Sequence, residues 1–187
     1  MRVLALSGSL RAGSHNSRLL RAAAAVAPPG VEVVVATELL RAIPPFDEDH
    51  EAVGTPAPVV ALKDAIAAAD AVLFATPEYN HSIPGQLKNA LDWASRPYDA
   101  TPLKGKPVAV VGASTGLFGA VWAQAELRKV LAATGAVVHD AELPIGLAHD
   151  AFAEDESTDR LAADEHHESL GDVLRSLADL AGEPQPA

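Results

Sequence analysis

The fold is decided near the start of the chain, where a short apolar run leads directly into a polar turn: Val3-Leu-Ala-Leu-Ser-Gly-Ser-Leu-Arg-Ala-Gly-Ser-His-Asn-Ser-Arg18. The run from Val3 to Ser7 is typical of a strand that is buried on both faces of a sheet. The alanine-rich stretch from Ser17 to Val26 predicts a helix that can pack closely against such a sheet. A strand that passes through a turn into a helix is the first unit of a parallel α/β sheet.

The turn between these two elements is crowded with hydrogen-bonding side chains, which are Ser9, Arg11, Ser14, Asn16 and Ser17. The first turn of a helix leaves backbone N–H groups unpaired and carries a partial positive charge, so polar side chains placed there can surround a phosphate. A guanidinium can also hold two phosphate oxygens at once. Because Ser14 or Asn16 alone would suffice as a helix cap, five such side chains favour a phosphate site over a simple cap.

The glycines of this turn narrow the class of phosphate ligand. A P-loop needs Lys and then Ser or Thr after its last glycine, whereas Gly13 is followed by Ser14 and His15. A dinucleotide fingerprint needs Gly-x-Gly-x-x-Gly, and Leu10 stands where its second glycine should be. The turn therefore predicts a site for the phosphate of a mononucleotide.

Apolar runs and helical periodicity alternate along the rest of the chain. Strands are predicted over 31–36, 71–76, 108–112 and 136–139, and helices over 58–69, 119–134 and around 170–180. The alternation predicts one domain over residues 1–182, with a flexible tail at 183–187. We expect a flavodoxin-like, doubly wound sheet of five parallel strands in the order 2-1-3-4-5, which binds its ligand between strands one and three.

Two further loops should meet the phosphate turn at the same sheet edge. The loop after strand three contains Pro77, Glu78, Tyr79 and Asn80, whose backbone polar groups and aromatic ring can contact a planar heterocycle. Taken alone, it is equally consistent with an ordinary loop that half-buries its tyrosine.

The loop after strand four runs from Gly112 to Gly119 and includes Ser114, Thr115 and Gly116. Its small residues allow a flat ring to approach the backbone. The three loops together predict a phosphate anchor and two walls around a flat ligand with the dimensions of FMN.

Composition limits the remaining possibilities. The chain has 187 residues, 49% of them hydrophobic, so it can bury a substantial core as one domain. It has no cysteine, which excludes disulfides, thiol catalysis and thiolate metal sites. The net charge of -11 argues against nucleic-acid and anionic-membrane partners. With no leader or membrane-spanning pattern apparent, we expect a cytoplasmic protein. We expect no metal site, because His166 and His167 are adjacent in the sequence and therefore do not share one helix face.

Several segments together resemble the NADPH-dependent FMN reductases, a family that includes quinone, chromate and azo-compound reductases. The similarity extends from Met1 to about Val138 and is carried by Gly8-Ser-Leu-Arg11 with Ser14 and Asn16, Pro77-Glu-Tyr-Asn80, Ser82-Ile-Pro-Gly85, Leu87-Lys-Asn-Ala-Leu-Asp-Trp93 and Gly112-Ala-Ser114. The resemblance implies that Ser9, Arg11, Asn16 and Ser17 hold the FMN phosphate. It also implies that residues 77–80 and Ser114 contact the ribityl chain and the ring.

The same resemblance implies an oxidoreductase that passes hydride from NADPH, or possibly NADH, through FMN to a small acceptor. The acceptor would be a quinone, free flavin, a metal oxyanion or an azo compound. No protein nucleophile is required, because the flavin carries the redox chemistry. One open site serving two substrates predicts ping-pong kinetics. Family members form dimers or dimers of dimers, and we expect the helix region 84–95 to provide that contact.

Two alternatives remain open at this point. Residues 112–116 also read Gly-x-Ser-x-Gly, so Ser114 could be the nucleophile of a serine hydrolase, with Asp140 or Asp150 and His149, His166 or His167 as partners. A hydrolase would, however, have no use for the Arg11 phosphate site, and no His-Gly-Gly-Gly oxyanion loop is present. A flavodoxin-like electron carrier without enzymatic activity is the second alternative, against which Arg11 and the 77–80 loop argue.

Overall fold

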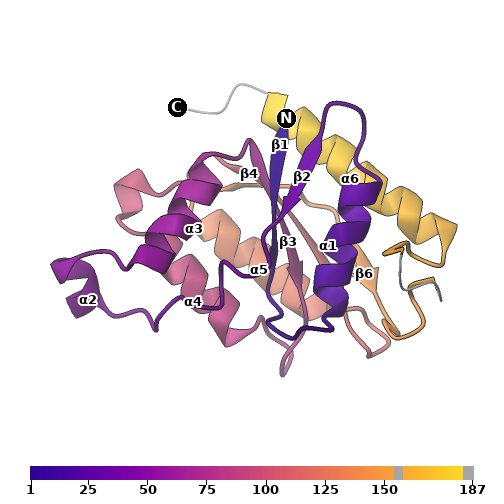
Figure 1. The fold of residues 1–187 in the computed structure, drawn as a ribbon, viewed down its shortest axis with the longest axis horizontal. Coiled ribbons are helices and arrows are strands. Elements are labelled where there is room, and N and C mark those ends of the chain that lie inside the picture. Colours follow the sequence, from indigo (N-terminus) through magenta and orange to yellow (C-terminus); the bar gives the residue numbers. More distant parts are fainter. Residues whose placement is uncertain (154–157, 183–187) are drawn as a thin grey trace.

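A parallel sheet forms the centre of the computed structural model, which describes residues 1–153 and 158–182 (Figure 1). The strands lie in the order β2-β1-β3-β4-β5, which confirms the predicted flavodoxin-like topology. A short strand, β6, was not predicted and pairs with β4 beyond the end of β5. The strands are β1 (Arg2–Ser7), β2 (Glu32–Val35), β3 (Ala71–Thr76), β4 (Pro107–Ala113), β5 (Val137–Val138) and β6 (Pro144–Ile145).

Helices cover both faces of this sheet. One face carries α1 (His15–Ala25) and α6 (Asp164–Gly182), which lie side by side in Figure 1. The other face carries α3 (Ala57–Ala67), α4 (Gly85–Ala94) and α5 (Val121–Ala133). A six-residue helix, α2 (Glu48–Val53), has no buried residue, and a short 3₁₀ turn, η1 (Tyr98–Ala100), follows α4.

The alternation of side chains along β1 divides the core into two layers. Val3 and Ala5 pack with α1 and α6, whereas Leu4 and Leu6 pack with the helices of the opposite face. This is the period-two pattern of a strand whose two faces are both covered. Because β1, β3 and β4 run parallel, their carboxyl ends lie at one edge of the sheet, where the three predicted loops emerge.

Helix α1 begins two residues earlier than predicted. Ser14 is its N-cap, and the Ser14 hydroxyl accepts a hydrogen bond of 3.1 Å from the backbone N–H of Ser17. The helix therefore starts inside the polar turn, and His15 and Asn16 occupy its first turn.

The predicted flexible tail, residues 183–187, lies outside the described residues. Within the described ranges, no helix combines the length and hydrophobicity that a membrane span requires.

Candidate functional site

A pocket of about 300 Å³ opens at the carboxyl edge of the sheet, where the loops after β1, β3 and β4 meet. All three predicted loops contribute to it. Its lining residues are Ser9, Arg11, Ser14, His15, Asn16, Pro77, Glu78, Tyr79, Ala113, Ser114 and Thr115. Nine of the twelve predicted site residues are in this set, and Ser17, Asn80 and Gly116 are not.

The turn after β1 is organised around the hydroxyl of Ser7, which is fully buried. This hydroxyl donates to the Ser9 carbonyl at 3.3 Å and accepts from the Ser9 N–H at 3.2 Å. The Ser17 hydroxyl donates to the same oxygen at 3.1 Å, so Ser17 stabilises the turn through Ser7. The backbone N–H groups of His15 and Asn16 belong to the first helical turn and have no partner within the helix.

Arg11 is exposed at this turn, and its guanidinium forms no hydrogen bond or ion pair with another described residue. One of its terminal nitrogens lies above Gly13, 3.5 Å from where a Cβ atom would stand. Burial, and then the charges of Arg11 and Arg18, lowers the pKa of the His15 imidazole below 6.5. An unpaired guanidinium beside free helix amides, in a chain with a net charge of -11, fits an anionic group such as the FMN phosphate.

Asn16 joins the phosphate turn to the loop after β4. Its side-chain amide donates to the Ala113 carbonyl and accepts from the Ala113 N–H, both at 2.9 Å. Strand β3 ends at Thr76, which pairs with Gly112, so Ala113 has no strand partner on that side. The Asn16 amide takes the place that the next residue of β3 would have occupied.

The loop after β3 contains a two-residue β-hairpin. Tyr79 and Ser82 exchange backbone hydrogen bonds of 3.0 and 3.1 Å across Asn80 and His81. Both central residues have positive φ, 54° and 61°, as a type I′ turn requires. Asn80 is therefore at the exposed tip of the turn and does not line the pocket.

Glu78 connects this loop to α5. Its carboxylate accepts a hydrogen bond of 3.2 Å from the Ala123 N–H in the first turn of the helix. The side chain is only 12% exposed, and its other oxygen lies 3.6 Å from Nδ1 of His81. The residue lines the pocket, while its carboxylate holds the loops after β3 and β4 together.

The loop after β4 is held by the segment around β6. The Ser114 N–H donates to the Ile145 carbonyl, and the Ala148 N–H donates to the Ser114 carbonyl, each at 3.0 Å. Gly146 is required in this pairing because a Cβ atom there would stand 2.2 Å from the Leu117 carbonyl oxygen. Gly116 donates its N–H to the Ser114 hydroxyl at 3.1 Å, but it is exposed and does not line the pocket.

The geometry of Ser114 does not support the hydrolase alternative. A nucleophile elbow places its serine on a strained backbone turn, but Ser114 is not among the residues with positive φ. Its hydroxyl accepts from Gly116, and no described histidine forms a hydrogen bond with it. The serine instead belongs to a pocket wall made of small residues.

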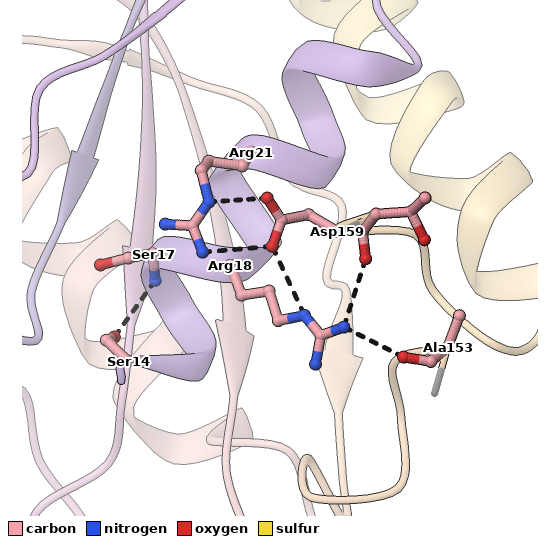
Figure 2. A network of polar contacts seen from close by, with 7 residues as sticks. Ser14, Ser17, Arg18, Arg21, Ala153 and Asp159 are labelled. Atoms are coloured by element: carbon pink, nitrogen blue, oxygen red, sulfur yellow. Dashed lines mark hydrogen bonds and ion pairs between the residues drawn. The ribbon is translucent and has the colours of Figure 1, made fainter. Parts of the chain in front are cut away.

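The segment that precedes α6 contacts helix α1 through ion pairs and hydrogen bonds. Figure 2 shows Arg18 and Arg21 of α1 converging on Asp159, with N–O distances of 3.4 and 2.7 Å. Arg18 also donates to the Ala153 carbonyl at 3.0 Å, and its guanidinium lies 4.6 Å from the centre of the Phe152 ring. Arg18 and Arg21 are therefore both paired with Asp159, whereas Arg11 in the turn after β1 can pair with an anionic ligand.

Three residues of the site were missed in the sequence. Ser7 was counted as the last strand residue, and its position directly before Gly8 was the available signal. His15 lies within the quoted turn but was considered only as an argument against a P-loop. Ala113 offers backbone atoms alone, so no side-chain pattern could reveal its pairing with Asn16.

No group of three His, Asp or Glu side chains arranged to hold a metal ion occurs among the residues that the structure describes.

A family model and similar curated proteins point to the same family. The family model of the NADPH-dependent FMN reductases matches residues 1–150. An NAD(P)H-dependent FMN reductase of Pseudomonas aeruginosa is 43% identical over 178 residues, which are 95% of this chain and 93% of the relative. A quinone reductase of Escherichia coli (strain K12) is 44% identical over 139 residues, which cover 74% of this chain and 73% of the relative.

The fold agrees with a solved structure. FerB, a flavoenzyme NAD(P)H:(acceptor) oxidoreductase from Paracoccus denitrificans, superposes with a TM-score of 0.82 at 35% sequence identity, covering 96% of each chain. The chain therefore belongs to the NADPH-dependent FMN reductase family, and is a flavodoxin-like oxidoreductase that depends on FMN and NAD(P)H.

Proposed function

We propose that this enzyme transfers hydride equivalents from NADPH or NADH to a small acceptor in a ping-pong cycle, and that quinones are the leading acceptor class. The observation that carries the proposal is the pocket at the carboxyl edge of the sheet, where an unpaired Arg11 and free helix amides adjoin two walls of small or planar groups. The quinone reductase of E. coli supports the choice of acceptor.

We assign the phosphate end of the cofactor to Ser9, Arg11, Ser14 and the first-turn amides of α1. Asn16 and Ser17 would act there mainly by holding the turn in shape, since their side chains already bond Ala113 and Ser7. The ribityl chain and the ring would lie between residues 77–79 and 113–115. When bound, FMN supplies the electron-transfer chemistry, and the protein orients it and controls access.

Exposed aromatic side chains beside the pocket would receive the acceptor. Tyr79 lines the pocket, and Phe118 of the loop after β4 and Trp122 in the first turn of α5 have their ring centroids 5.2 Å apart. These rings are 45% exposed or more, so a planar acceptor can stack on them. A single opening for nucleotide and acceptor requires that one leave before the other enters, which is the basis of the ping-pong proposal.

The test is spectroscopic and kinetic. The purified protein, incubated with FMN and desalted, should show the absorbance bands of oxidised flavin and lose them when NADPH is added without oxygen. Addition of a quinone should restore the bands, and double-reciprocal plots should give parallel lines. Intersecting lines would contradict the ping-pong cycle, and the absence of catalytic NADPH consumption would favour a simple electron carrier.

We further propose that the enzyme is a homodimer or a dimer of dimers through residues 84–95. The family resemblance supports this choice, and the outer side of α4 carries Lys88 and Asp92 in a partly exposed pair. Light scattering should give two or four times the 19.3 kDa chain mass. Lys88→Glu should lower that mass, whereas Lys129→Glu, an exposed lysine of α5, should not. A monomeric wild-type protein would overturn this proposal.

A further inference from the structure

His81, not glycine, occupies the second central position of the type I′ turn after β3. Its φ of 61° places a residue with a branched ring in the left-handed region, where glycine is the usual occupant of a type I′ turn. A non-glycine residue in this region costs about 1–2 kcal/mol. Its side chain is 78% exposed, so burial does not compensate this cost. Strain retained at the rim of a pocket points to a functional side chain.

The surroundings of the ring orient it. Nδ1 lies 3.6 Å from the Glu78 carboxylate, which leaves Nε2 on the opposite side of the ring. The ring meets Trp122 edge to face, with 5.1 Å between the two centroids. Glu78 is the one charged group of the described residues that contacts His81, so its carboxylate fixes the side of the ring that carries Nδ1.

Quinone reduction requires a proton in addition to the hydride equivalent. The hydride equivalent brings two electrons and one proton, so the oxygen that becomes negatively charged needs a second proton to give the neutral hydroquinone. An imidazolium is suited to supply it, because imidazole is the side chain that changes charge in water between pH 5 and 8.

We propose that His81 is the proton donor to the acceptor oxygen and that Glu78 holds its ring in position. In this step the Nε2–H bond breaks and an O–H bond forms on the quinone. The neutral imidazole then regains its proton from water, which its exposure allows. The inference rests on the proposed quinone reductase function, and it assigns a catalytic role to a residue of this chain.

Two other groups near the pocket are less suited to the role. His15 lines the phosphate end, and burial lowers its pKa, so it favours the neutral form. Tyr79 is half-exposed in the same hairpin, but a phenol releases its proton less readily than an imidazolium. Of the residues that the structure describes, His81 is the one that combines an ionisable ring, a carboxylate partner and contact with the exposed ring of Trp122.

The experiment compares two acceptors in the FMN-loaded enzyme. A quinone needs the second proton, whereas hexacyanoferrate(III) takes up single electrons and no proton. His81→Asn keeps a residue that tolerates the left-handed turn but cannot donate a proton in this pH range. His50→Asn, on the exposed helix α2, is the matched control.

We expect His81→Asn to lower kcat with the quinone about tenfold to hundredfold, within the range of general acid catalysis. Its kcat with hexacyanoferrate(III) should stay within about twofold, and the quinone rate should lose its dependence on pH. Equal losses with both acceptors would overturn the inference, as would unchanged quinone turnover. If the wild-type enzyme oxidises NADPH with neither acceptor, the proposed function itself fails.

Acceptor binding can be measured without turnover. The chain has two tryptophans, of which Trp93 is fully buried and Trp122 is 45% exposed, so quenching by a quinone reports on Trp122. We expect the quinone to quench this emission with the same midpoint in the wild type and in His81→Asn. A shifted midpoint would mean that His81 binds the acceptor rather than protonating it. Absence of quenching would mean that the acceptor does not bind beside Trp122.

Discussion

Replacement of Asn16 by alanine tests whether the two halves of the cofactor pocket depend on one amide. The substitution removes two buried hydrogen bonds of 2.9 Å and leaves the N–H and the carbonyl of Ala113 without a partner. A buried polar group left unsatisfied costs about 1–3 kcal/mol. The free energy of unfolding should therefore fall by about 2–4 kcal/mol.

The same change should weaken FMN binding, because Asn16 ties the phosphate turn to the loop after β4 across 97 positions of sequence. Asn89→Ala is a matched control. Its amide also bonds two backbone groups, accepting from the Phe46 N–H at 2.7 Å and donating to the Pro44 carbonyl at 2.8 Å, but it lies away from the pocket. We expect both variants to lose stability and Asn16→Ala alone to lose FMN affinity.

Urea denaturation of the protein without FMN, followed by circular dichroism, gives the stability change. Titration of FMN, followed by the quenching of its fluorescence, gives the affinity. The reasoning is refuted if the free energy of unfolding of Asn16→Ala lies within about 0.5 kcal/mol of the wild-type value, which is the range of ordinary surface substitutions. It is equally refuted if the two variants lose FMN affinity to the same extent.

Three further predictions concern charged groups of the site. Arg11→Ala should lower FMN affinity about tenfold to hundredfold, since a hydrogen bond to a charged group contributes about 1.5–3 kcal/mol, and riboflavin, which lacks the phosphate, should bind both proteins alike. The pKa of His15 is lowered by burial and by neighbouring positive charges, and a bound phosphate should raise it; binding then takes up a proton, so FMN affinity should rise as the pH falls through the range in which His15 titrates. His15→Gln should remove that dependence in the same titration, and an unchanged slope would contradict the assignment. Glu78→Ala should lower the unfolding free energy by about 1 kcal/mol by leaving the Ala123 N–H uncapped, whereas Glu78→Gln, which keeps an acceptor, should lose less in urea denaturation.

The elements with strong apolar patterns were predicted from the sequence, and the weakly patterned ones were not. Strands β3 and β4 are buried along their whole length and β1 from Val3 onward, so their apolar runs are unambiguous. Helix α2 buries no residue and therefore has no apolar face to detect. Strand β6 has two residues and begins at a proline, so only its pairing with β4 identifies it.

The positions of the site loops were predictable, but the directions of several side chains were not. The strand order brings the loops after β1, β3 and β4 to one edge, which is why most of the predicted residues line one pocket. Ser17 and Glu78 are directed toward internal partners, Ser7 and Ala123, that belong to other elements. Such pairings depend on the packed structure and have no signature in local sequence.

The contacts of Arg18 limit how far the chain can be truncated from its C-terminus. The family model ends at residue 150, yet Ala153 and Asp159, beyond that limit, hold the helix that starts at the turn after β1. Leu170, Leu174 and Leu177 of α6 belong to the same buried cluster as α1. A truncation at residue 150 would therefore remove α6 from this face of the sheet, together with the contacts that hold α1. The segment after residue 150 therefore helps to shape the turn after β1, and exchanging it between relatives should alter cofactor retention.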